Sequence, residues 1–186
     1  MTKPFLRRNV PLWTLLLVIA AFIISVVQIC ADIDLHIEES KRFISDMNVC
    51  AEGIARNLEN AYEETNNSEK VEASLIGAYL YSEELRSLLY REPMCTILGK
   101  KLHLFSGIDA PPDRVFPHVA SQLKGIRDEY LETKVLSETS QSLIEELSMV
   151  FLEFCDSGSN QAISRESFTE RLNTLCIKLY TKVYAK

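Results

Sequence analysis

The stretch from Val10 to Ala31 constrains this chain most, because it is apolar, carries no formal charge and is long enough to cross a bilayer as one helix. A helix rises about 1.5 Å per residue, so about 20 apolar residues match a hydrocarbon core about 30 Å thick. The sequence therefore predicts three parts: a short basic N-terminus (1–9), a transmembrane helix (10–31) and a single domain (32–186).

Charge on either side of the apolar segment predicts its orientation. Lys3, Arg7 and Arg8 precede the segment, whereas acidic residues, beginning with Asp32 and Asp34, follow it directly. By the positive-inside rule the N-terminus stays in the cytoplasm. We therefore expect a single-pass protein of the cell membrane, with the remaining 155 residues outside the cytoplasm.

A cleaved secretory signal is the alternative interpretation of this segment. Signal peptides have an apolar region of about 7–15 residues and end in a small-x-small cleavage site. Here the apolar run is longer, and Ile29 occupies the position three residues before the best cleavage point, after Ala31. Ile29 also precedes Cys30, where lipid attachment needs a small residue. An uncleaved signal anchor is the favoured prediction.

Composition excludes one class of partner for the domain. Residues after Ala31 include 17 basic and 26 acidic side chains, which gives a formal charge of −9. Nucleic-acid binders neutralise phosphates with Lys and Arg, so no nucleic-acid partner is expected. A length of 155 residues suits one domain with a substantial core.

Apolar residues after the membrane segment recur at alternating steps of four and three. This spacing is typical of a helix that packs along another helix, as in a coiled coil. Membrane segment and seam are predicted to form one continuous helix that ends near Glu64 and acts as a rigid stalk. The seam consists of Ile33, Ile37, Ser40, Ile44, Met47, Ala51, Ile54, Leu58 and Ala61.

The rest of the chain also has mainly helical patterns. A capping box at Asn66 and Glu69 predicts a helix that runs back to Pro93, and a shorter helix is expected over Met94–Phe105. Apolar stripes at 119–130 and 143–154 predict two helices or one long one, and another at 168–183 predicts the last helix. The expected fold is all-α: an antiparallel four- to five-helix bundle with one clear loop, residues 106–117.

Two surfaces are candidates for binding. The first is a basic stripe on the last helix, formed by Arg171, Lys178, Lys182 and Lys186, which would contact an acidic partner or anionic lipid. Alternatively, these cations complement the helix C-terminal dipole. The second is the loop, whose prolines would hold Ile108, Val115 and Phe116 near the surface. In the alternative interpretation the loop is a plain connector with these residues turned inward.

The pattern of reactive residues favours a protein without enzymatic activity. His36, His103 and His118 are scattered, and the chain contains no CxxC, HExxH or GxSxG motif. No metal or cofactor is therefore expected. Cys155 and Cys176 would be offset by about 16 Å along an antiparallel pair, too far for a disulfide. Unpaired, largely buried thiols are predicted, with a nonlocal pair such as Cys50 and Cys176 as the alternative.

These features support two functional hypotheses. The first is a membrane-anchored, extracytoplasmic helical scaffold that holds a protein partner, or a second copy of itself, near the membrane. The alternative is a ligand-sensing helical bundle that acts through a separate signalling protein, because no second apolar span leads back to the cytoplasm.

Overall fold

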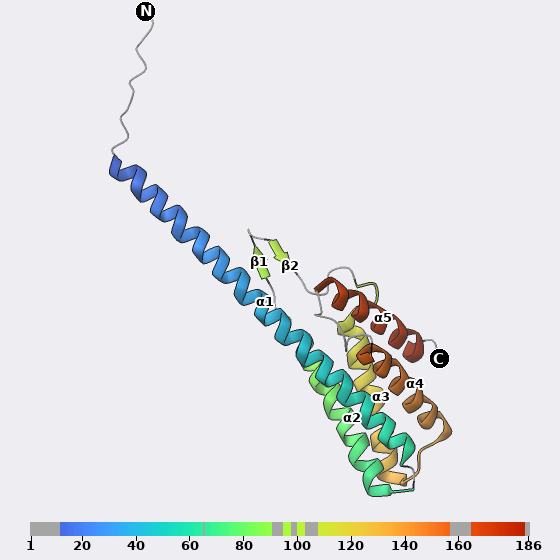
Figure 1. Cartoon of the computed structure of the whole chain (residues 1–186). Coiled ribbons are helices and arrows are strands. Elements are labelled where there is room, and N and C mark those ends of the chain that lie inside the picture. The colour runs from blue at the N-terminus through green and yellow to red at the C-terminus, as the bar shows by residue number, and fades with distance from the viewer. Residues whose placement is uncertain are drawn as a thin grey trace, which may run out of the picture. The chain divides into compact units, whose positions relative to one another are not determined.

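The computed structural model describes residues 12–64, 66–90, 95–97, 100–102, 108–156 and 165–184. The described chain is almost entirely helical, which confirms the all-α class, and it contains five helices and one short hairpin (Figure 1). In chain order these are α1 (Leu12–Glu63), α2 (Ser68–Leu89), β1 (Cys95–Ile97), β2 (Lys100–Leu102), α3 (Pro112–Thr133), α4 (Glu138–Asp156) and α5 (Arg165–Tyr184).

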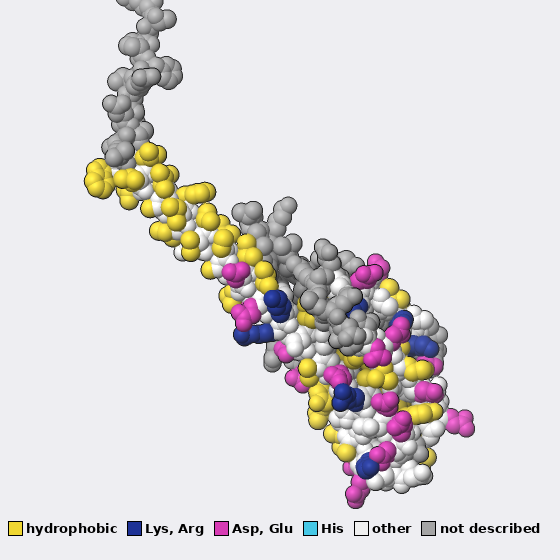
Figure 2. Space-filling model, in the orientation of Figure 1, with side chains coloured by type: hydrophobic (Ala, Val, Ile, Leu, Met, Phe, Trp, Pro, Cys, Tyr) yellow, Lys and Arg dark blue, Asp and Glu magenta, His cyan; other side chains and the backbone are white. Residues whose placement is uncertain are grey.

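The chain divides into two units, one up to Glu39 and one from Ser40 onward. The first unit contains the apolar part of α1, where an 18-residue window has a mean hydropathy of 2.7 and none of the window is buried. Hydrophobic side chains cover this part of the helix in Figure 2. By length and composition α1 could therefore cross a membrane, although a signal sequence meets the same criteria.

In the second unit, the apolar stripes of the five helices meet in one hydrophobic core. The predicted seam of α1 belongs to this core from Ile44 onward, since Met47, Ile54 and Leu58 are almost completely buried. Upstream, in the first unit, Ile37 is exposed. Helix α2 packs on α3, and α5 packs on both α3 and α4.

Helices α1 and α2 approach closely at two glycines. Gly53 of α1 lies against the ring of Tyr81, and Gly77 of α2 lies against the side-chain amide of Asn57. A β-carbon at either glycine would come within 2.6 Å of these neighbours. The turn before α2 also differs from the prediction in one respect: Asn67, not Asn66, caps the helix, and its side chain accepts a hydrogen bond from the Lys70 amide.

The predicted loop 106–117 is wrong in its second half. Helix α3 begins at Pro112, and Pro117 lies within it. A proline is well tolerated in the first turn of a helix, where amide groups have no helical acceptor, so Pro112 suits a helix start, whereas Pro117 lies beyond the first turn. Val115 and Phe116 are consequently helical and buried.

The expected helix over Met94–Phe105 is wrong where the structure describes it. Cys95–Ile97 and Lys100–Leu102 form an antiparallel hairpin, in which Ile97 pairs with Lys100 across a two-residue connection. The other positions of the predicted helix lie outside the described residues.

Helices α3 and α4 are separate, so the prediction of two helices over residues 119–154 is confirmed and that of one long helix is wrong. Lys134 ends α3 with a left-handed backbone conformation, φ 56°. The carboxylate of Glu129 then accepts hydrogen bonds from the Ser137 amide at 3.1 Å and from the Ser140 hydroxyl at 2.6 Å. These contacts tie the end of α3 to the start of α4.

Candidate functional site: the α4–α5 groove

The apolar stripe of α5 determines which way its basic residues face. Phe168, Leu172, Leu175 and Leu179 recur at helical spacing and are buried, so this side of α5 lies against the core. Arg171, Lys178 and Lys182 therefore lie along the flank of α5 that faces α4. The structure brings these three predicted site residues together, whereas Lys186 lies outside the described residues.

Each of the three cations has a partner on α4. Lys178 forms an ion pair with Glu153, and Lys182 lies 3.7 Å from the carboxylate of Glu146. Residue numbers increase in opposite directions across these two pairs, so α4 and α5 are antiparallel neighbours. The basic stripe is therefore largely neutralised by acidic residues of its own chain.

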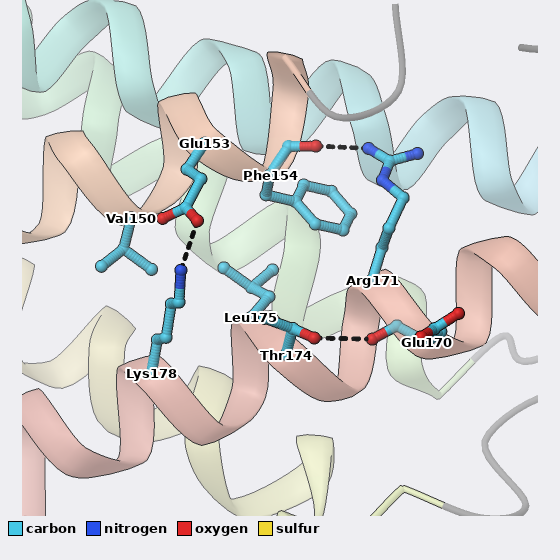
Figure 3. A pocket seen from close by; sticks show the side chains of 8 residues that line it. All are labelled: Val150, Glu153, Phe154, Glu170, Arg171, Thr174, Leu175 and Lys178. Carbon is cyan, nitrogen blue, oxygen red and sulfur yellow. Dashed lines mark hydrogen bonds and ion pairs between the residues drawn. The ribbon is translucent and has the colours of Figure 1, made fainter.

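Arg171 is held by the end of α4 in two ways. Its guanidinium lies 4.6 Å from the centre of the Phe154 ring, and it donates a hydrogen bond to the Phe154 carbonyl (Figure 3). Stacking over an aromatic face is a favourable geometry for a guanidinium. Burial lowers the pKa of Arg171 from its usual value.

These contacts border a surface groove between α4 and α5. The groove has a volume of about 240 Å³ and an apolar floor, with charged residues along its sides (Figure 3). Its lining comprises Val150, Glu153, Phe154, Glu170, Arg171, Thr174, Leu175 and Lys178. Small-molecule sites are usually about 300–1,000 Å³, so the groove is better suited to a protruding side chain than to a large ligand.

Charge is segregated across the groove. All five charged residues of α4 are acidic, whereas the charged residues of α5 after Glu170 are basic. Sequence reasoning found the basic stripe but missed the acidic edge that accompanies it. The signal was present as Glu146 and Glu153, which lie seven residues apart on one side of a helix.

The second predicted surface is mostly buried. Val115 and Phe116 are 1% exposed and Ile108 packs against the core, so the inward-facing alternative describes these residues better. The segment before α3 is also tied to α5, because the Asp109 amide donates to the side-chain oxygen of Asn173 at 2.9 Å. This segment therefore contacts α5, and Val115 and Phe116 of α3 offer no apolar surface to a partner.

Three cysteine thiols of the second unit have low reactivity because they are buried. Cys30, Cys50, Cys155 and Cys176 are free thiols, as the sequence predicted. Burial raises the pKa of Cys50 and of Cys176 to about 12, and it raises the pKa of Cys155, beside Glu52, to about 11. A thiol that stays protonated is a poor nucleophile and a poor metal ligand.

Comparison of the chain with models of known protein families, with curated proteins and with solved structures gives no match to any of them.

Proposed function

We propose that this chain is a single-pass membrane protein with no enzymatic activity, and that its domain holds a protein partner at the membrane surface. The observation that carries this proposal is the apolar part of α1, none of which is buried. A helix of such hydropathy in a soluble protein would be covered by its own core. A bilayer would supply the missing apolar surroundings.

The proposed topology is that of an uncleaved signal anchor. Lys3, Arg7 and Arg8 favour a cytoplasmic N-terminus, and residues 32–186 would then form an extracytoplasmic antiparallel bundle. Helix α1 runs from Leu12 to Glu63 without interruption, so it supports a stalk shared by the membrane segment and the domain.

A role in protein interaction is favoured by the nature of the groove. Its polar groups are mainly long charged side chains, among them the Glu153–Lys178 ion pair, an arrangement that suits recognition of another protein surface. The ligand-sensing alternative would need a larger pocket with converging polar groups.

Extraction of the full-length protein from membranes tests the anchor. We expect it to stay in the membrane pellet at alkaline pH, with an intact mass that includes residues 1–31. Ile19→Arg together with Ile23→Arg should release it, because each charge costs about 2.5–3.5 kcal/mol at the centre of a span.

Leu35→Arg with Ile37→Arg is the matched control, since both residues are exposed and apolar but lie beyond the span. That pair should leave the protein in the pellet. Release of the unmodified protein, or loss of its first 31 residues, would refute the anchor. Cross-linking in native membranes tests the partner, and a strictly monomeric, uncross-linked protein would refute the scaffold.

A further inference from the structure

The outward face of α4 and α5 combines segregated charge with exposed apolar residues. Met149 lies three residues after Glu146 and four before Glu153, so it shares their side of α4 and is 56% exposed. On α5, Ile177 is 43% exposed and lies three residues after Thr174 and seven after Glu170, which both line the groove, so it shares their side of α5. We call this surface, with the groove between its helices, the α4–α5 face.

We propose that a second copy of this chain docks on the α4–α5 face and forms a two-fold symmetric dimer. A symmetric interface must be complementary to itself. A two-fold axis parallel to the helices places the acidic α4 of one copy opposite the basic half of α5 in the other. An axis across the helices would instead place α4 on α4, acidic on acidic. Charge therefore selects the first arrangement.

Rotation about an axis parallel to the helices preserves the level of each residue along them. Glu153 and Lys178 lie at one level within a copy, since they form an ion pair. In the dimer, Glu153 of each copy would face Lys178 of the other copy. The Glu153 side chain is 64% exposed and that of Lys178 is 38% exposed. A carboxylate accepts several hydrogen bonds and an ammonium group donates three, so both can serve a second partner.

The apolar residues are placed to meet in the same arrangement. Met149 lies between the levels of the two ion pairs, and Ile177 lies one residue before Lys178, close to the level of the Glu153–Lys178 pair. The axis therefore brings Met149 of each copy to within about one helical turn of the level of Ile177 of the other, beside the groove floor of Val150 and Leu175. An unbranched methionine adapts readily to such a shallow surface.

The dimer rests on the proposed function, because its affinity depends on both copies being anchored in the same membrane. Two helices about 28 Å long and 10 Å wide offer roughly 560 Å² per copy, below the roughly 800 Å² of a standard stable interface. Confinement to one membrane raises the effective concentration of both copies.

Charge reversal in full-length protein tests the dimer. Two differently tagged copies are co-expressed, and one is captured from membranes after brief chemical cross-linking. Glu153→Lys and Lys178→Glu, each present in both copies, should reduce recovery of the second tag at least tenfold, because like charges then face each other across the axis.

Co-expression of a Glu153→Lys copy with a Lys178→Glu copy should restore recovery. Every pair across the axis is then attractive, while the pair within each copy stays repulsive. The mixture thus distinguishes the effect of ion pairs between copies from that of the ion pair within one copy. Lys70→Glu, at an exposed ion pair far along the chain, is the control and should not alter recovery.

Unchanged recovery with either single variant, or no recovery in the mixture, would overturn the dimer. Capture of a different protein by a chain that stays in the membrane would refute the dimer alone. Release of the protein at alkaline pH would refute the anchor, whatever the charge variants show.

Discussion

At the scale of single residues, the two glycines between α1 and α2 have the clearest energetic consequence. Gly53→Ala would place a methyl group 2.6 Å from the Tyr81 ring, so the ring or the helix must move. We expect a loss of about 1–3 kcal/mol in the free energy of unfolding, as for other overpacked positions. Urea unfolding of the full-length protein, followed by circular dichroism, measures this loss.

Gly125→Ala is the matched control, because nothing lies within 4 Å of the position its methyl group would take. Within an exposed stretch of α3, that change should stabilise the protein by about 0.5–1 kcal/mol, since alanine favours the helix more than glycine does. Equal effects of the two substitutions would contradict the close approach at Gly53.

At the scale of helices, the contact between α3 and α4 depends on the ionised Glu129 carboxylate. Hydrogen bonds from Ser140 and Ser137 lower the pKa of Glu129 below its usual value. Stability from this group is therefore complete above the unfolded-state pKa, near 4.5, and is lost as pH falls through the lower folded-state value. Glu129→Gln should cost about 0.5–1 kcal/mol at pH 7, like the loss of a helix cap.

The measurement is the difference in melting temperature between the original protein and the Glu129→Gln variant at several pH values. This difference should shrink as the pH falls below 4.5 and through the lowered folded-state pKa, because the original carboxylate then becomes protonated as well. Glu132→Gln, an exposed change in the last turn of the same helix, should show a smaller difference at pH 7. A difference that does not change with pH would contradict a role for the charge.

The boundaries of these helices and strands show which structural features a sequence pattern can predict. The seam from Ile44 to Ala61 was predictable because its period reports directly which side of α1 is buried. The start of α3 was not, since prolines suit both a loop and a first helical turn. The hairpin was missed because a short apolar run gives too few residues to distinguish a period of two from 3.6.

The candidate site was predictable only in part, for a related reason. Steps of seven and four placed Arg171, Lys178 and Lys182 on one stripe of α5. Their pairing with Phe154, Glu153 and Glu146 depends on how α4 and α5 align, which no local pattern within either helix specifies. Only the folded structure therefore shows that acidic residues of α4 neutralise much of the basic stripe.

At the scale of the whole molecule, burial in the core should slow the alkylation of the cysteine thiols. At pH 8, a thiol with a pKa of about 12 is about one part in 10⁴ thiolate, against roughly one part in four at a pKa of 8.5. We therefore expect Cys50 and Cys176 to react with iodoacetamide about 10³-fold more slowly in native protein than after denaturation. Peptide mass spectrometry gives both rates.

Rising pH should speed the reaction in the native state toward pH 12, provided that the protein stays folded. Denaturation without a reductant should make Cys30, Cys50, Cys155 and Cys176 fully reactive, because all four are free. A thiol that reacts only after reduction would instead reveal a disulfide, such as one between Cys50 and Cys176.

The two glycine contacts between α1 and α2 also determine where the sequence can accept inserted residues. Gly53 and Tyr81 lie equally far in sequence from Asn67, and so do Asn57 and Gly77, so both contacts specify one alignment of α1 with α2. Alignment is thus encoded within the helices and does not depend on the turn between them. Related sequences should accept extra residues at this turn, whereas an insertion between Gly53 and Asn57 would break one contact or the other.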